Sequence, residues 1–396
     1  MHQIRVVFVA CLSTMVGPMP AYQLGATAVL MPGALGLDAA WLGIATAIFF
    51  ACSALASVPG GKLADRVGGS VGIRLAAVTS VVACVGIART DHYQELVLWM
   101  ALGGMANGVA QPSGNVAIRR HITSARFGLA FGIKQAAVPM ATCAAGASVP
   151  LLAVPLGWRY AFLVAIVPAL LVIVLAPWRW ERRPRSAASH AGGRPPAGRT
   201  LLVLAVAATL GASANCALGT FFVPSAEAHG ISPAVAGLLV SLASASGIAS
   251  RILVGALADR RPGHEFTMVT CMLTGGAIGI FGLAFAAPVP VVALAAVVAY
   301  GIGWSWQGLM SHGVATLHPD HSGAATGMVH TGLFLGGAIG PFGFGWLAHA
   351  AGFGAAWAAV IVILLTAGAL VHVGRRVATG AEPRRAAPSP AASGGG

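Results

Sequence analysis

The sequence predicts an all-α membrane protein of about twelve transmembrane helices, arranged as two pseudo-symmetric six-helix bundles. The prediction comes from the composition, the spacing of the apolar segments and an internal repeat. Hydrophobic residues make up 57% of the 396 residues and charged residues only 8%, whereas roughly 25% of the residues in soluble domains are charged. A soluble domain of this length could not cover its surface with so few charges.

The apolar segments have the length that a membrane span requires, about 20 mostly apolar residues. A basic break in the middle of the chain divides them into two sets of six. The predicted spans are 6–30, 39–59, 73–90, 95–118, 127–150 and 160–178, and then 200–223, 233–256, 266–287, 290–316, 324–348 and 354–373.

The central break, Arg179 to Arg199, contains six arginines together with a Gly-Gly and a Pro-Pro pair. This composition is typical of a flexible linker. The end of the chain is rich in Pro, Ala, Ser and Gly, which favours disorder. The predicted domains are therefore an amino-terminal bundle (1–178), a cytoplasmic linker (179–199), a carboxy-terminal bundle (200–376) and a disordered tail (377–396).

The positive charges predict the orientation in the membrane. If both termini are cytoplasmic, 19 of the 23 Lys and Arg residues fall in cytoplasmic segments, as the positive-inside rule requires. We therefore expect a multi-pass protein of the cell inner membrane. The formal charge of +13 comes from these loop clusters, so it indicates contact with the bilayer and not with nucleic acid.

An internal repeat supports the division into two halves. The segment Gly61-Lys-Leu-Ala-Asp65-Arg66 recurs as Gly255-Ala-Leu-Ala-Asp259-Arg260, and Gln111 matches Gln307 at a similar offset. A consistent offset at several positions indicates duplication of a six-helix unit.

The first copy of this motif, with Gly68 two residues after Arg66, resembles the signature loop of the major facilitator superfamily. The resemblance covers nearly the whole chain and implies transport through a single chain that works as a monomer. One departure is that Gly69 and Ser70 stand where the family usually has a basic pair. The resemblance implies a gating role for Gly61, Asp65, Arg66, Gly68, Asp259 and Arg260.

The gating motif also has a physical rationale. A glycine such as Gly61 lets two helices approach closely, and the Asp65 carboxylate can face the positive end of a neighbouring helix. The alternative interpretation is a turn with ordinary solvated charges.

Lys134 and Arg251 are the two cations that lie away from the ends of the predicted spans, one in each half. Each lies roughly 12 Å inside the membrane edge at 1.5 Å per residue, where a charge is unfavourable unless it serves a cavity. All ten Asp and Glu residues lie in loops or at the ends of predicted spans, so we expect the counter-ion to be the substrate. In the alternative interpretation, Arg251 snorkels to the membrane edge or braces Asp259.

Further polar and aromatic residues in the spans are expected to contact the substrate. Asn107 and Gln111 recur four residues apart in the fourth span and so share a helix face. His330 is expected to carry a co-transported proton, because histidine titrates near neutral pH. For all of these residues, packing or hydrogen bonding between helices is the alternative. The predicted substrate-binding residues are Lys134, Arg251, Asn107, Gln111, Tyr22, Asn215, Trp304, Gln307 and His330.

Together these features predict a secondary transporter that moves a small organic anion, such as a carboxylate, by alternating access. The chain has no phosphate-binding loop, so ATP-driven transport by this chain alone is not expected. Its histidines are too dispersed for an enzyme or a bound metal, no cofactor is expected, and a non-transporting receptor would be expected to lose the gating motif, which is kept in both halves. The main alternative is proton-coupled efflux of drugs or other small molecules. The family's drug exporters usually carry an acidic residue in helix 1, an arginine in helix 4 and a Gly-Pro pair in helix 5, and this chain has none of the three.

Overall fold

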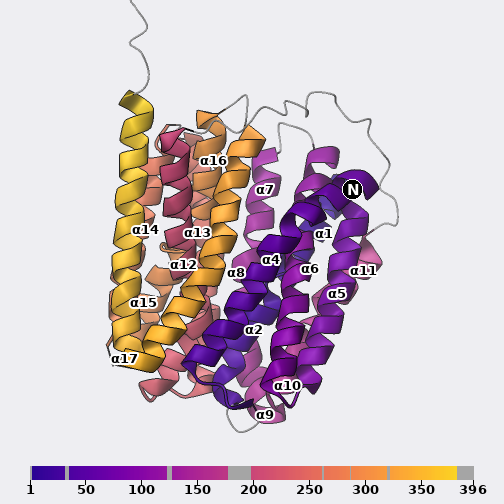
Figure 1. The fold of residues 1–396 in the computed structure, drawn as a ribbon, viewed down its shortest axis with the longest axis vertical. Coiled ribbons are helices and arrows are strands. Elements are labelled where there is room, and N and C mark those ends of the chain that lie inside the picture. The colour runs from indigo at the N-terminus through magenta and orange to yellow at the C-terminus, as the bar shows by residue number, and fades with distance from the viewer. Residues whose placement is uncertain are drawn as a thin grey trace, which may run out of the picture.

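The computed structural model describes residues 2–31, 35–122, 127–176, 198–260, 263–285, 287–318 and 322–380, and every regular element in these residues is a helix (Figure 1). Within the first half the helices are α1 (His2–Val16), α2 (Met19–Thr27), η1 (Ala28–Leu30), α4 (Ala39–Val67), α5 (Gly69–Arg89), α6 (Tyr93–His121), α7 (Phe127–Gln135), α8 (Ala137–Ser148), the π-helical η3 (Val149–Ala153), α9 (Val154–Leu156), α10 (Trp158–Val164) and α11 (Ile166–Leu175). Within the second half they are α12 (Arg199–Ala228), α13 (Pro233–Arg260), α14 (Glu265–Leu283), α15 (Val289–Gly301), α16 (Gln307–Leu317) and α17 (Ser322–Gly380).

The described helices group into twelve passes, which confirms the predicted fold class. Eight are long and apolar enough to cross a membrane, or nine if α1 and α2, which meet at a 42° bend, count as one span. The positive φ of Gly352 divides α17 into two antiparallel helices, which adds a tenth pass. The more polar α6 is the eleventh, and the short helices α15 and α16 together make the twelfth.

Two of the predicted segments reach the edge of the described residues. The linker prediction (179–199) falls almost entirely outside them, and only its last residues are seen at the start of α12. Of the predicted tail (377–396), residues 377–380 continue α17 as helix, and the remainder lies outside the described residues.

Glycines at the turns preserve the internal repeat. Among the described residues, six glycines have positive φ values, a conformation that side-chain-bearing residues rarely adopt. They form three pairs, each 194 or 195 positions apart, the offset of the sequence repeat. The pairs are Gly36 with Gly230, Gly68 with Gly263, and Gly157 with Gly352.

The two halves pack closely at the end of the molecule that lies away from the amino terminus (Figure 1). A Cβ atom placed on Gly146 of α8 would lie 2.6 Å from the Gly237 carbonyl oxygen of α13. One placed on Gly25 of α2 would lie 2.7 Å from the Thr220 carbonyl oxygen of α12. The absence of side chains at these crossings therefore lets backbones from the two halves touch.

A polar contact joins the halves at the same end. Asp38 precedes α4 and accepts a hydrogen bond from the Trp41 backbone N–H through Oδ1 (2.8 Å), which caps the helix. Its second oxygen, Oδ2, lies 3.2 Å from Nδ1 of His349 in α17. Both side chains are exposed to solvent, so this contact contributes modestly to stability.

The halves separate toward the end that carries the amino terminus. Cβ atoms placed on Gly132, Gly255, Gly308 or Gly327 would meet no atom within 4 Å. These glycines lie in α7, α13, α16 and α17, which come from both halves. The halves are therefore in backbone contact at one end, whereas space remains beside these four helices at the other.

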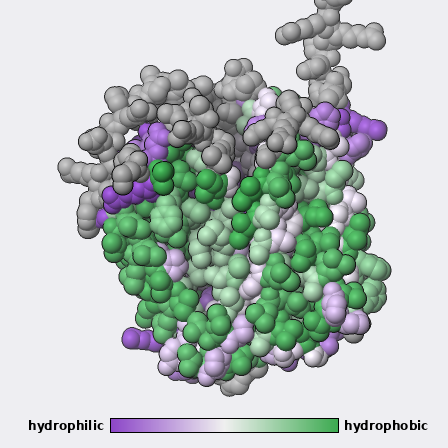
Figure 2. Space-filling view, turned by 180° about the vertical axis from the view of Figure 1, so that it is seen from behind, coloured by the Kyte–Doolittle hydropathy of each residue, from purple (hydrophilic) through white to green (hydrophobic). Residues whose placement is uncertain are grey.

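The outer surface fits a lipid environment. Many large apolar side chains are exposed, among them Leu55, Ile278 and Val174. Figure 2 shows hydrophobic residues across the middle of one face, with hydrophilic residues toward its margins. Such a broad exposed apolar surface is unusual for a soluble monomer and expected of a membrane protein.

The closed end yields a first prediction. Gly146→Ala places a methyl group against the α13 backbone, so we expect it to lower thermal stability by about 1–3 kcal/mol, the usual effect of overpacking. Gly132→Ala is the matched control, because the same methyl group would enter open space. Thermal unfolding of the two detergent-purified variants tests this expectation, and equal midpoints would contradict the observed close approach.

Candidate functional site

Lys134 lies at the carboxyl end of α7 and is buried against α6. Its Nζ donates a hydrogen bond to Oε1 of Gln111 (2.9 Å), and its side chain is 2% exposed. The absence of a side chain at Gly114 makes room for the lysine, because a Cβ placed there would lie 3.0 Å from Lys134 Cε. Two predicted substrate-binding residues, Lys134 and Gln111, are therefore in direct contact, and the acceptor is a neutral amide.

Arg251 extends from α13 to backbone carbonyl groups in both halves. Its Nη1 donates to the Gln135 carbonyl oxygen (2.7 Å), and its Nη2 donates to the Trp304 carbonyl oxygen (3.0 Å). Gln135 is the last residue of α7, and Trp304 lies in the non-helical segment between α15 and α16. Within the described residues neither Arg251 nor Lys134 forms an ion pair with Asp or Glu. The guanidinium of Arg251 therefore binds carbonyl oxygens at the junction, which is not the snorkelling considered for it, and the side chain of Asp259 lies outside the described residues.

Hydroxyl groups continue this contact between α8 and α13. Thr142 Oγ1 and Ser244 Oγ are 2.7 Å apart, and Ser241 Oγ donates to the Cys143 carbonyl oxygen (3.0 Å). These contacts and the Gly146–Gly237 approach form a single polar seam between the halves. Arg251 lies at the seam's end nearest the amino terminus of the molecule.

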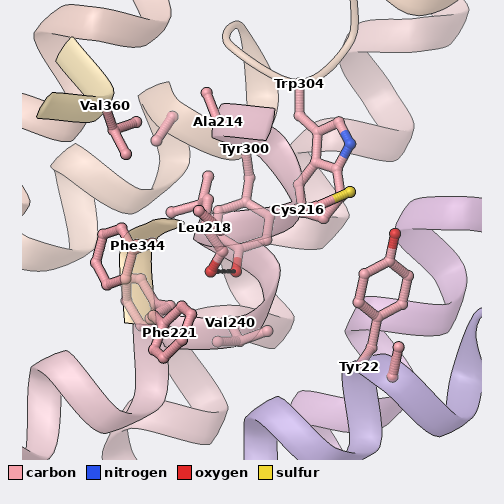
Figure 3. Packing of buried hydrophobic residues seen from close by; sticks show 14 of the residues in the cluster. Tyr22, Ala214, Cys216, Leu218, Phe221, Val240, Tyr300, Trp304, Phe344 and Val360 are labelled. Carbon is pink, nitrogen blue, oxygen red and sulfur yellow. Dashed lines mark hydrogen bonds between the residues drawn. The ribbon is translucent and has the colours of Figure 1, made fainter. Parts of the chain in front are cut away.

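Aromatic side chains border the junction near Arg251. Tyr22 of α2 makes an edge-on contact with Trp304 (5.7 Å between ring centroids), and Trp304 lies 5.2 Å from Tyr300. Figure 3 shows Tyr22 facing Trp304 and Cys216 across the boundary between the halves. The structure therefore places two predicted substrate-binding residues, Tyr22 and Trp304, beside a third, Arg251.

Asn215 holds the non-helical segment between α15 and α16 in place. With its amide oriented to satisfy both neighbours, it donates to the Gly303 carbonyl oxygen (3.2 Å) and accepts from Trp306 Nε1 (3.2 Å). Asn215 is 3% exposed and Trp306 is fully buried. These contacts favour a structural role for Asn215.

Three other predicted residues have different surroundings. Asn107 is buried and donates to Ser53 Oγ (3.1 Å) on α4. His330 of α17 is half-buried, and its Nδ1 lies 2.9 Å from the Thr326 carbonyl oxygen. Gln307 begins α16 and is half-buried.

The gating motif occupies the turn between α4 and α5. Gly68 ends α4 with a φ of 98°, which explains why a glycine stands there. The close approach expected at Gly61 occurs one residue earlier: a Cβ on Gly60 would lie 2.9 Å from Val109 Cα, whereas one on Gly61 would make an ordinary contact of 3.6 Å with Pro112.

The charged residues of the motif are at the surface. Asp65 and Arg66 are exposed, and the Asp65 backbone carbonyl accepts a hydrogen bond from Arg120 of α6 (2.9 Å). In the second copy of the motif, the side chains of Asp259 and Arg260 lie outside the described residues, although their backbone continues α13.

Sequence reasoning missed two features of the site. Pro139 lies four residues after Gln135. Because proline has no N–H, the Gln135 carbonyl oxygen loses its helical hydrogen-bond donor, and this spacing could have indicated an unpaired oxygen. Glu265, which opens α14, is buried beside His312 of α16, with 3.5 Å between Oε1 and Nδ1. Its position just outside a predicted span gave no sign of this burial.

A groove of about 450 Å³ lies between α12 and α17 in the second half. Its walls are mostly apolar, and its two threonine hydroxyls donate to carbonyl groups of their own helices. The lining residues are Leu202, Ala205, Val206 and Thr209 of α12 and Met328, Thr331, Gly332 and Leu335 of α17.

Two six-helix halves that meet around a polar junction define a membrane transport protein. The sequence matches the Major Facilitator Superfamily over residues 6–316 and over residues 201–394, and the chain belongs to this family of secondary transporters. Two relatives, from two strains of Mycobacterium tuberculosis, are described as uncharacterized MFS-type transporters. Each is 27% identical to the chain over 340 residues, which cover 82% of the chain and 74% of the relative.

Solved structures show the same fold. A bacterial homologue of the human lysosomal transporter Spinster, in an inward-facing and unoccupied conformation, gives a TM-score of 0.74 at 16% identity and covers 96% of this chain and 98% of its own. A D-xylose–proton symporter gives 0.76 at 18% identity and covers 93% and 97%. At these identities the likeness concerns the fold alone.

The contacts of Asn215 generate a second prediction. Asn215→Ala leaves the Gly303 carbonyl and the Trp306 N–H without partners, so we expect a loss of about 1–3 kcal/mol in stability. Gln307→Ala, at a half-buried position nearby, should change stability by less than about 0.5 kcal/mol. Thermal unfolding combined with transport assays separates the roles: normal stability with abolished transport in Asn215→Ala would instead indicate substrate contact.

Proposed function

We propose that this transporter moves a small organic anion, most simply a carboxylate, across the cell inner membrane by alternating access. The observation that carries the proposal is the surroundings of Lys134: a buried lysine whose Nζ faces the neutral amide of Gln111 and no described carboxylate. A cation held in a span without an internal counter-ion favours an anionic ligand.

The arrangement of the hydrogen-bond donors supports the same proposal. Lys134 and Arg251 come from different halves, and both bind uncharged oxygen atoms. A carboxylate accepts charge-assisted hydrogen bonds that are roughly twice as strong as those of neutral acceptors. An anion that enters the junction can therefore compete for these donors, while Tyr22 and Trp304 provide an aromatic wall for its carbon skeleton.

The relative packing of the halves supports alternating access. They pack closely at the Asp38–His349 end and separate at the end with the amino terminus. With both termini in the cytoplasm, as the positive charges predict, this conformation opens toward the cytoplasm. Rocking of the halves about the central residues would expose the same site to the opposite side, and one chain would supply the whole pathway.

The third prediction tests the anion. In proteoliposomes, radiolabelled acetate, lactate, pyruvate, succinate and benzoate are compared with lactamide and glucose as neutral compounds. We expect saturable uptake of at least one carboxylate. Lys134→Met retains most of the side-chain volume but removes the charge, so it should reduce this uptake by roughly 10–100-fold, the equivalent of one hydrogen bond to a charged group.

Arg89→Met provides the control, because Arg89 is an exposed cation in the last turn of α5, outside both the gating loop and the junction. Its uptake should remain within about threefold of the wild type, since surface substitutions have small effects. Transport of the neutral compounds only, or normal carboxylate uptake by Lys134→Met, would overturn the proposal and favour efflux of other small molecules.

A further inference from the structure

The carbonyl of Gln135 has no donor in its own helix. In a continuous α-helix a carbonyl accepts from the N–H four residues later, and the residue four positions after Gln135 is Pro139, which has no N–H. The helix is interrupted at this place, between α7 and α8. Because an unpaired backbone group within a membrane costs several kcal/mol, this oxygen needs a donor from elsewhere.

Arg251 supplies that donor from the opposite half. The guanidinium carries five N–H donors in a planar fork, so it can bind two acceptors at once. One arm binds the Gln135 carbonyl oxygen at 2.7 Å, and the other binds the Trp304 carbonyl oxygen at 3.0 Å. A single side chain therefore joins a helix interruption in the first half to one in the second.

This contact lies at the boundary between the packed and the separated parts of the molecule. On one side of it, the polar seam of Thr142–Ser244 and Ser241–Cys143 holds α8 against α13. On the other side, Cβ atoms on Gly132 of α7 and Gly255 of α13 would meet open space. Loss or gain of the Arg251 contact would therefore change how far the close packing of α7 and α8 against α13 extends.

We propose that Pro139 is a positioning residue for Arg251. By withholding an N–H, it leaves the Gln135 carbonyl as the acceptor that holds the guanidinium at the junction until an anion replaces that carbonyl. The anionic nature of the competitor rests on the proposed function, whereas the dependence of Arg251 on Pro139 does not. Since a carboxylate is a stronger acceptor than a carbonyl, binding of the anion releases the contact between α7 and α13.

Pro139→Ala restores the missing N–H and therefore removes the need for Arg251 at Gln135. The anion then no longer competes with the carbonyl, so KM for carboxylate uptake should fall by roughly 10-fold, the equivalent of one hydrogen bond to a charged group. Vmax should fall as well, because arrival of the anion no longer releases a contact between the halves. A purely structural role of the proline would instead raise KM or leave it unchanged.

The direct test measures the distance between α7 and α13 without any substrate. Spin labels are attached at Ile133→Cys and Leu253→Cys, both exposed positions that flank the contact, in a chain whose native cysteines are replaced by alanine. Double electron–electron resonance should give a narrow distribution in the parent chain and a broader, longer one in Pro139→Ala. Pro59→Ala, at an exposed proline inside α4, is the control and should resemble the parent.

A backbone ester at position 139 distinguishes the effect of losing the proline ring from the effect of gaining an N–H. Lactic acid introduced at position 139 by nonsense suppression has the side chain of alanine but no N–H, so the narrow parent distribution should return. Arg251→Lys should broaden the distribution as Pro139→Ala does, and the double variant should show no further change. An unchanged distribution in Pro139→Ala, an ester that behaves like Pro139→Ala, or additive effects in the double variant would each overturn the proposal.

These outcomes are independent of the proposed function. If the proteoliposomes take up no carboxylate, the anion proposal fails, while the distance measurements still decide whether Pro139 positions Arg251. If carboxylates are transported and Pro139→Ala leaves the distances unchanged, the proposed function stands and the role of Pro139 is refuted.

Discussion

The need to satisfy every backbone polar group inside a membrane determines how the centre of this transporter is built. Continuous helices meet this need themselves, but the passes formed by α7 and α8 and by α15 and α16 are interrupted. Arg251 binds carbonyl groups at both interruptions, and Asn215 with Trp306 braces the second one. Polar side chains in the spans thus make the local departures from helix possible.

The interruptions also show where the two halves have diverged. The repeat is preserved at the turns, where three pairs of positive-φ glycines keep the same offset. It is not preserved at the junction. Gln307 follows the break between α15 and α16, yet its counterpart Gln111 lies inside the continuous helix α6, and α17 runs unbroken through His330, the counterpart of Gln135. Divergence is therefore concentrated where the halves meet.

The sequence was sufficient for the fold because composition, span length and repeat all reflect the same physical requirement, the crossing of a bilayer. It also singled out Lys134 and Arg251, because charges in apolar segments are rare. It could not predict their partners. The acceptors of Arg251 are backbone carbonyls, which every residue has, and only the Pro139 spacing distinguishes Gln135. Polar residues such as Asn107 and Asn215 look alike in sequence whether they face a ligand or another helix, and tertiary packing alone separates these cases.

The two carboxylate oxygens of Asp38 make different contacts. Oδ1 caps the start of α4, and Oδ2 contacts His349 of the other half. If the halves rock as proposed, only the second contact has to break when this end opens, and the first turn of α4 keeps its cap. The boundary between the halves can thus be broken and remade repeatedly without fraying the helix that carries it. One carboxylate thus serves both as a lasting helix cap and as a contact between the halves that can be broken.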